Sequence, residues 1–224
     1  MQTYKQEFIA FMVRAGVLTF GDFITKSGRA TPYFVNTGNY RTGSQISALG
    51  DYYAACIGAS GEAFDALFGP AYKGIPLSVA AASSLYRLHD RDISFCFNRK
   101  EAKDHGEGGS LIGHKPKAGD KIAIIEDVVT AGTAVRETVE LFKQVADVEL
   151  TALFVSVDRM ERGTGEVSTL QELRDTLGLR VYPIVTVREI IEFLHNRELD
   201  GRVVITDKIR ENMEAYLAQY GGRA

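Results

Sequence analysis

The sequence predicts an α/β fold with a mainly parallel central sheet flanked by helices and a small N-terminal lobe that contains a β-hairpin. From residue 65 onward, short apolar runs alternate with amphipathic helical runs, which is typical of parallel strands joined by crossover helices. Most of these apolar runs are continuous, as expected for strands that are buried on both faces. Upstream, two extended runs flank a turn-rich stretch, which indicates a hairpin.

The N-terminal elements follow from local patterns. Residues 3–15 place apolar side chains at helical spacing before Gly16, so they predict an amphipathic helix that ends at that glycine. Residues 18–25 (LTFGDFIT) and 32–38 (PYFVNTG) flank KSGRATP and predict the two hairpin strands. A helix is expected over 44–60. We expect a single domain over 1–224, in which residues 1–40 form much of a small lobe over the active site.

The rest of the chain predicts alternating strands and helices. Strands are expected at 65–70, 93–98, 121–127, 151–157 and 181–187, and helices at 75–89, 133–145, 168–177 and 189–195. Ligands of such sheets bind beyond the carboxyl ends of the strands. The segments 69–74, 98–109, 126–133 and 158–162 are therefore expected to gather at one rim.

Composition limits the class of protein. The formal net charge is −3 and no basic face stands out, which weighs against a nucleic-acid partner. Cys56 and Cys96 lie in apolar surroundings and suit buried thiols in a reducing compartment. No apolar run approaches the length of a membrane span, and the start MQTYKQEF lacks the pattern of a signal peptide. These observations predict a soluble cytoplasmic protein without a membrane partner.

The most informative stretch is IAIIEDVVTAGTAVRE, residues 122–137, where a buried strand ends in Glu126 and Asp127. Small residues then lead into a helix, so backbone N–H groups and the helix dipole can approach a phosphate closely. Carboxylates can accept hydrogen bonds from ribose hydroxyls and stabilise positive charge on a sugar ring. The stretch therefore predicts a ribose 5-phosphate site. The alternative is a helix cap, but a cap needs one acid and not an adjacent pair.

A second stretch, NRKEAKDHGEGGSLIGH, carries cations among glycines between two strands. It is either a solvated charged loop or a lid that closes over a diphosphate, excludes water and neutralises the leaving group. The cations are Arg99, Lys100, Lys103, His105 and His114.

These stretches carry a family resemblance. The acidic stretch, with two acids, two apolar residues and T-x-G-T, resembles the phosphoribosyl diphosphate motif of type I phosphoribosyltransferases. The segments KSGRATPYF, FGPAYKGIPL, NRKEAKDHGEGG and VSVDRMERGTGE resemble the bacterial type of the orotate phosphoribosyltransferase family, in the expected order and over nearly the whole chain. The resemblance implies transfer of phosphoribosyl from phosphoribosyl diphosphate to orotate in pyrimidine synthesis. It also implies Mg²⁺ as cofactor and a homodimer with shared active sites.

The resemblance also implies roles for individual residues. The catalytic residues are expected to be Lys103, His105, Glu126 and Asp127. Phosphoribosyl diphosphate is expected to contact Lys26, Tyr72, Lys73, Arg99, Lys100, Lys103, His105, Glu126, Asp127, Val128, Val129, Thr130, Ala131, Gly132, Thr133 and Ala134. Orotate is expected to contact Phe34, Val35, Thr130 and Arg159. No protein ligand is assigned to Mg²⁺, which substrate oxygens and water are expected to hold.

Two positions depart from the family pattern. Glu126 stands where many relatives have Asp, and Val35 stands where some have Phe, so Val35 contacts orotate through its backbone or belongs to the hairpin core. His89, His114 and His195 match no functional position and are interpreted as surface or helix residues. Two alternatives stay open: a phosphoribosyltransferase that acts on another base, and a non-catalytic regulator that senses phosphoribosyl diphosphate.

Overall fold

A six-stranded sheet forms the centre of the protein. The computed structural model describes residues 1–25, 28–99, 110–163 and 165–223. The strand order is β5-β4-β3-β6-β7-β8, and every strand pairs in parallel except β5, which runs antiparallel to β4. The mainly parallel sheet is thereby confirmed. The strands are β3 (Ala66–Gly69), β4 (Ser94–Asn98), β5 (Leu111–Gly113), β6 (Lys121–Glu126), β7 (Glu149–Asp158) and β8 (Arg180–Thr186).

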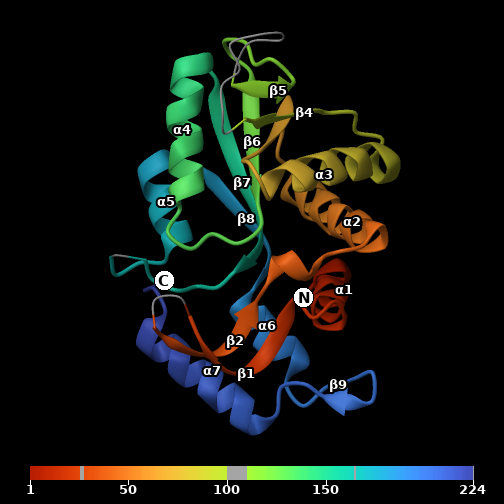
Figure 1. Ribbon diagram of the computed structural model, residues 1–224, viewed down its shortest axis with the longest axis vertical. Coiled ribbons are helices and arrows are strands. Elements are labelled where there is room, and N and C mark those ends of the chain that lie inside the picture. Colours follow the sequence, from red (N-terminus) through yellow and green to blue (C-terminus); the bar gives the residue numbers. More distant parts are fainter. Residues whose placement is uncertain (26–27, 100–109, 164, 224) are drawn as a thin grey trace.

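Helices cover both faces of this sheet (Figure 1). On one face lie α2 (Gly43–Ser60) and α3 (Gly74–His89), and on the other lie α4 (Thr133–Val145) and α5 (Thr169–Leu177). Because side chains alternate along a strand, Ala123 and Ile125 enter the core on the α2 and α3 side, whereas Ile122 and Ile124 enter the core beneath α4 and α5. Burial on both faces explains why β6 reads as a continuous apolar run.

The predicted hairpin is present and lies beside the sheet's carboxyl edge (Figure 1). It pairs β1 (Leu18–Ile24) with β2 (Ala30–Val35), and a short 3-10 helix (Thr37–Asn39) follows. The flanking helices are α1 (Thr3–Arg14), α6 (Val187–Leu194) and α7 (Asp207–Tyr220), and a small ribbon pairs β9 (Glu198–Leu199) with β10 (Arg202–Val203). Helix α7 packs along β2, so segments near both ends of the chain lie together.

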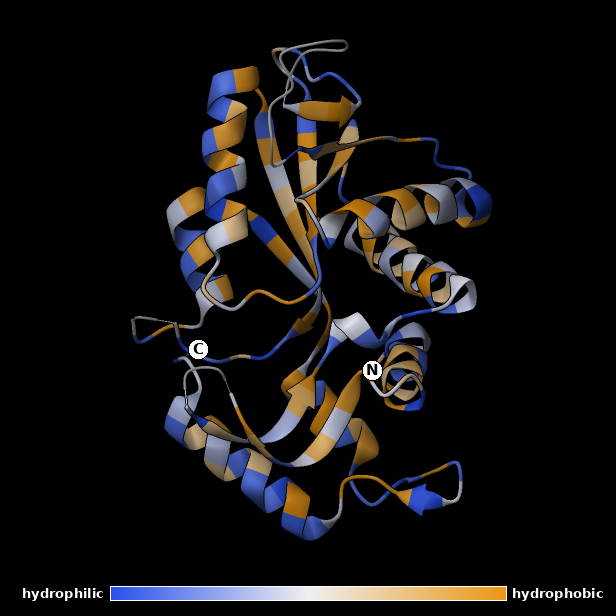
Figure 2. Ribbon diagram, in the orientation of Figure 1, coloured by the Kyte–Doolittle hydropathy of each residue, from blue (hydrophilic) through white to orange (hydrophobic). Residues whose placement is uncertain are grey.

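Helix α7 is the main element that the sequence patterns did not predict. Thr206 begins it, with a side-chain oxygen that accepts a hydrogen bond from the Ile209 N–H, and Gly221 follows its last residue. Hydrophobic and hydrophilic residues alternate along α7, as they do along α4 (Figure 2). In α7 the buried side chains are Met213, Tyr216 and Leu217. Of the helices that the structure describes, none has the length and apolar character needed to cross a membrane.

Candidate active site

A cavity of about 800 Å³ opens where the carboxyl ends of β6 and β7 meet the hairpin. Three of the four segments expected at the rim, 69–74, 126–133 and 158–162, contribute to the lining together with residues of the hairpin and of α4. Most of the fourth segment, 98–109, lies outside the described residues. Among the lining residues are Arg29, Phe34, Val35, Thr37, Lys73, Asp127, Val128, Val129, Thr130, Ala131, Arg136, Asp158, Arg159 and Glu161.

Asp127 is a buried acid of the cavity that pairs with a lysine. It is 8% exposed, and its Oδ2 accepts a hydrogen bond from Lys73 Nζ at 2.7 Å. The Thr37 hydroxyl donates a short hydrogen bond to the same oxygen, and Lys73 Nζ also lies 3.0 Å from Thr37 Oγ1. Ser156 fixes the backbone by donating its hydroxyl to the Asp127 carbonyl at 2.6 Å. A carboxylate and an ammonium are thus held together at the mouth of the phosphate loop.

Glu126 differs from its neighbour in its electrostatic environment. Its Oε2 accepts the Asp127 N–H at 3.1 Å, and its carbonyl accepts the Tyr53 hydroxyl at 2.6 Å. Burial, followed by the charge of Asp127, raises the pKa of Glu126 to about 7. The adjacent acids are therefore not equivalent, because Glu126 takes up a proton close to neutral pH.

This raised pKa predicts a pH-dependent gain in stability for Glu126→Gln. Between pH 4.5 and 7 the unfolded state loses the Glu126 proton while the folded state keeps it, so the free energy of unfolding falls as pH rises. Each unit of pKa is worth about 1.4 kcal/mol, so we expect the neutral amide to stabilise the protein by about 1–3 kcal/mol at pH 8. Urea unfolding at pH 8 and pH 4.5 measures this, and an equal change at both values would contradict it.

The loop after the acid pair has the form of a phosphate site. Gly132 occupies the N-cap of α4 with a φ of 74° and has no side chain to accept the first N–H groups of the helix, which stay available to an anion. Helix α5 supports this loop, because the Thr169 hydroxyl donates to the Thr130 carbonyl at 2.8 Å. Arg136 and Glu172 form an ion pair at 2.6 Å between α4 and α5.

The other end of the cavity carries an aromatic ring and an arginine. Phe34 is 37% exposed and stacks on Phe23 with ring centroids 5.7 Å apart. Val35 lines the cavity and also packs against the hydrophobic core. Arg159 donates to Glu161 Oε1 from Nε at 3.0 Å and from Nη2 at 2.7 Å. The cavity lining thus combines a planar ring and a planar guanidinium with the Asp127 carboxylate.

The turn after β3 holds two further predicted residues. Tyr72 is 70% exposed, and the Ala71–Tyr72 peptide bond is cis. The turn is tight, since a Cβ on Gly69 would lie 2.0 Å from the Gly74 carbonyl oxygen. The Ala71 N–H donates to Asn98 Oδ1 at 2.8 Å, which ties this turn to the end of β4.

Several predictions concern the segment that follows β4. The Arg99 N–H donates to the Ser110 carbonyl at 2.8 Å, so Arg99 stands at one end of that segment. Four of the cations predicted to bind substrate lie outside the residues that the structure describes: Lys26, Lys100, Lys103 and His105.

Three residues at the cavity were missed from the sequence: Thr37, Arg136 and Glu161. Arg136 and Glu161 lie next to recognised motifs, but Thr37 is 90 residues from the Asp127 that it contacts, so no local pattern marks it. The three histidines without a role, His89, His114 and His195, do not line the cavity. His114 instead pairs with Asp120 at 2.8 Å.

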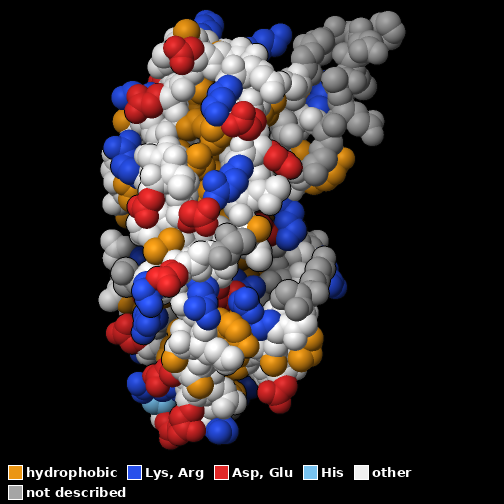
Figure 3. All heavy atoms as spheres, turned by 90° about the vertical axis from the view of Figure 1, so that its left-hand side faces the viewer, with side chains coloured by type: hydrophobic (Ala, Val, Ile, Leu, Met, Phe, Trp, Pro, Cys, Tyr) orange, Lys and Arg blue, Asp and Glu red, His pale blue; other side chains and the backbone are white. Residues whose placement is uncertain are grey.

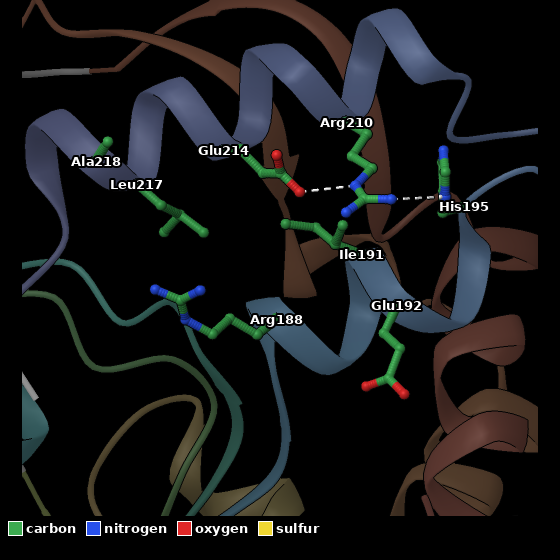
Figure 4. Close-up of a pocket in the computed structure, with 8 residues that line it drawn as sticks. All are labelled: Arg188, Ile191, Glu192, His195, Arg210, Glu214, Leu217 and Ala218. Atoms are coloured by element: carbon green, nitrogen blue, oxygen red, sulfur yellow. Dashed lines mark hydrogen bonds and ion pairs between the residues drawn. The ribbon is translucent and has the colours of Figure 1, made fainter.

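A second cavity of about 470 Å³ lies between α6 and α7 (Figure 4). Arg210 donates to Glu214 at 2.7 Å and contacts His195 Nδ1 at 3.2 Å, so these groups pair with each other. Among the described residues that were predicted for substrate binding, none lines this cavity.

The side of the molecule that carries α4 and α5 mixes charges of both signs (Figure 3). Lys and Arg side chains lie among Asp and Glu side chains over the described residues of this face, in keeping with the small net charge of −3.

Comparisons with known proteins agree with this geometry. Residues 37–169 match the phosphoribosyl transferase domain family. The chain is 53% identical to an orotate phosphoribosyltransferase of Clostridium beijerinckii and 54% identical to one of Lachnoclostridium phytofermentans, in each case covering 100% of both proteins. A crystal structure of orotate phosphoribosyltransferase from Francisella tularensis matches with a TM-score of 0.84 and 33% identity, over 96% of this chain and 100% of that one. The chain therefore belongs to the orotate phosphoribosyltransferase family.

Proposed function

We propose that the protein transfers the 5-phosphoribosyl group from phosphoribosyl diphosphate to orotate, giving orotidine 5′-phosphate and diphosphate in pyrimidine biosynthesis. The observation that carries this proposal is one cavity whose lining joins Asp127 and the loop that follows it to Phe34 and Arg159. Relatives that match over the full chain support the same reaction.

The anionic end of the cavity suits the ribose phosphate. Asp127 and Glu126 accept hydrogen bonds from the ribose hydroxyls, while residues 128–134 hold the 5-phosphate through backbone N–H groups and the N-terminus of α4. Lys73, paired with Asp127 before substrate arrives, exchanges that carboxylate for diphosphate oxygens. Tyr72 lies next to Lys73 and borders the same diphosphate.

The opposite end suits orotate. Phe34 offers an exposed ring face for stacking on the pyrimidine, and Val35 and Thr130 border the ring. Arg159 is a planar fork that can hold the ring carboxylate by two parallel hydrogen bonds. A base without a carboxylate forfeits these two bonds, so Arg159 provides selectivity for orotate.

The chemistry then requires little covalent participation by the protein. The bond from the anomeric carbon to the diphosphate oxygen breaks, and its electron pair leaves with diphosphate. The ring nitrogen of orotate, already deprotonated or losing its proton to solvent, donates its electron pair to the anomeric carbon. Asp127 stabilises the positive charge that builds on the ribose ring, while Lys73 stabilises the departing oxygens. Arg99, Lys100, Lys103 and His105 add positive charge to the diphosphate end.

Magnesium fits this arrangement as an ion carried by the substrate. In the described part of the chain, no three His, Cys, Asp or Glu side chains form a cluster that could hold a metal ion. Asp127 Oδ2 is already paired with Lys73, so Glu126 and Asp127 alone do not offer enough oxygen ligands to hold a metal ion. Mg²⁺ bound to diphosphate and ribose oxygens would neutralise the leaving group.

The decisive assay follows orotate absorbance with and without phosphoribosyl diphosphate and Mg²⁺. Orotate consumption that needs both, with hypoxanthine, adenine and uracil inactive, is the expected result. Transfer to another base would favour a different phosphoribosyltransferase. Binding of phosphoribosyl diphosphate without turnover, together with DNA retention at moderate salt, would favour a regulator.

We also propose a homodimer with shared active sites. Val79 and Tyr86 are seven residues apart on α3, hence on one face, and they are 41% and 61% exposed. An apolar helix face beside the turn that carries Lys73 suits a second copy of the chain, and the segment after Arg99 would then reach the neighbour's cavity.

Mixing two inactive variants tests this sharing. Lys103→Ala damages the loop and Asp127→Asn damages the acid pair. Random mixing makes half of the dimers mixed, and one of the two sites in each regains both intact parts, so activity should return to about a quarter of wild type. Activity is measured after co-refolding, with subunit exchange checked by tagged pull-down. Absence of recovery despite exchange would mean that each loop serves its own subunit.

We also propose that the protein is cytoplasmic and that it forms one domain. Cys56 and Cys96 are free and buried, and burial raises the pKa of both thiols to about 12, which suits a reducing compartment. We assign residues 1–224 to one phosphoribosyltransferase domain, in which the hairpin and α7 form the small lobe.

A further inference from the structure

Four donors converge on one carboxylate oxygen beside the cavity. Glu161 Oε1 accepts from Arg159 Nε at 3.0 Å and from Arg159 Nη2 at 2.7 Å. The same atom accepts the Tyr216 hydroxyl at 2.9 Å and the Tyr33 hydroxyl at 3.1 Å. Glu161 Oε2 lies 3.6 Å from Arg29 Nη1. Glu161 is therefore the centre of a network that includes the arginine assigned to orotate.

The network is rigid and draws on distant parts of the chain. Tyr33 comes from β2 and is fully buried, whereas Tyr216 comes from α7 and is 5% exposed. Their rings meet edge to face with centroids 6.0 Å apart, and the Arg159 guanidinium lies 5.3 Å from the Tyr33 ring centre. A turn at Met160, whose N–H donates to Asp158 Oδ1 at 2.7 Å, separates Arg159 from Glu161. Two buried hydroxyls thus fix the carboxylate that holds the arginine.

The hydrogen bonds to Glu161 occupy one side of the Arg159 guanidinium, through Nε and Nη2. A guanidinium has five N–H groups, and Glu161 engages Nε and one N–H of Nη2. The N–H groups of Nη1 and the second N–H of Nη2 form the remaining edge, which matches a carboxylate by two parallel bonds. Because Arg side chains lose rotamer freedom on binding, an arginine that is already held has less to lose when orotate arrives.

Considered by its charge alone, Glu161 would be expected to weaken the binding of orotate. Its negative charge lies next to the position proposed for the orotate carboxylate and opposes its binding. Removing that charge would tighten orotate binding if Glu161 served only to neutralise Arg159. If Glu161 instead orients Arg159, removing it would weaken orotate binding. The two roles therefore predict effects of opposite sign.

Building on the proposed orotate reaction, we propose that Glu161, held by the Tyr33 and Tyr216 hydroxyls, is a positioning residue that orients Arg159 toward the ring carboxylate of the base. Helix α7 does not contribute to the cavity lining among the described residues, yet through Tyr216 it sets selectivity for an acidic base.

The primary test is Tyr216→Phe, which removes one hydroxyl and keeps the ring and the charges. We expect the orotate KM to rise about three- to tenfold, since one hydrogen bond to a charged group is lost. The KM for phosphoribosyl diphosphate and kcat at saturating orotate should stay within about twofold of wild type, because a positioning effect on ground-state binding moves KM alone. Tyr220→Phe, one turn along α7, is the matched control and should leave all three constants unchanged. An unchanged orotate KM in Tyr216→Phe would overturn the proposal.

Glu161→Ala tests whether loss of the carboxylate weakens or strengthens orotate binding. We expect the orotate KM to rise about tenfold or more although a negative charge is removed, and Glu161→Gln, which keeps a carbonyl acceptor, to recover part of the loss. A lower or unchanged orotate KM in Glu161→Ala, in protein whose thermal unfolding matches wild type, would contradict the positioning role. If wild-type protein itself fails to consume orotate, the proposed function has failed, and that result is distinct from every outcome of the variants.

Discussion

Replacing Arg159 by alanine is expected to raise the orotate KM by about 30-fold or more while leaving the KM for phosphoribosyl diphosphate nearly unchanged. Loss of one partner from a buried, hydrogen-bonded charge pair typically costs about 2–5 kcal/mol, and each 1.4 kcal/mol is about tenfold. The Arg159 side chain is 14% exposed, so the orotate carboxylate would be left without its counter-charge in a largely dehydrated place. Of the two substrates, orotate alone carries that carboxylate.

Arg159→Lys is the matched control for charge. Lysine keeps the positive charge but loses the planar fork, so its orotate KM should fall between those of wild type and Arg159→Ala. Steady-state kinetics with each substrate varied in turn measure both constants. An unchanged orotate KM in Arg159→Ala would remove Arg159 from the orotate site. Equal increases for both substrates would instead indicate a general disturbance, which thermal unfolding of the variant would reveal.

The parts of the site that could be predicted from sequence are those encoded within one strand–loop–helix unit. Residues 122–137 combine a buried strand, two acids and a helix start in sixteen consecutive positions, and the structure places β6, the acid pair and the N-terminus of α4 in that order. The hairpin could be predicted for the same reason, because strand pattern and turn residues are neighbours in the chain.

The contacts that tune these residues could not be predicted because they join distant segments. Thr37 and Lys73 reach Asp127 from 90 and 54 residues away, and Tyr216 reaches Glu161 from 55 residues away. Helix α7 was missed although Thr206 and Gly221 mark its ends, since its exposed face makes residues 207–220 read as largely polar. Its burial depends on the hairpin, which lies almost two hundred residues earlier.

The site carries acidic side chains at the end of one strand and a basic side chain at the end of the next. In the proposed reaction, Asp127 and Glu126 at the end of β6 would face a sugar ring that gains positive charge, and Arg159 at the end of β7 would face the negative charge of the base. Since β6 and β7 are neighbours in the sheet, one pair of adjacent strand ends presents both signs of charge. In the proposed reaction, this arrangement would orient the two substrates toward each other before any bond changes.

A second large loss of activity is expected when Asp127 is replaced. Asp127→Asn should lower kcat/KM for phosphoribosyl diphosphate by about 100- to 10,000-fold, because hydrogen bonds from two ribose hydroxyls to a charged acceptor are worth about 1.5–3 kcal/mol each. The amide has the shape of the carboxylate but cannot accept on both sides, and it leaves Lys73 without its partner at 2.7 Å. Initial rates at saturating orotate with phosphoribosyl diphosphate varied measure the loss.

Glu126→Gln is the matched variant, and its effect should be smaller and depend on pH. Burial and the charge of Asp127 raise the pKa of Glu126 to about 7, so the free enzyme carries mostly neutral Glu126 at pH 6 and mostly ionised Glu126 at pH 8.5. Because kcat/KM reports the protonation state of the free enzyme, the amide should match wild type more closely at pH 6 and fall behind at pH 8.5. Asp127→Asn should be impaired at both values. Equal losses for the two variants at both pH values would mean that the acids share one role, and the asymmetry inferred from their surroundings would then be wrong.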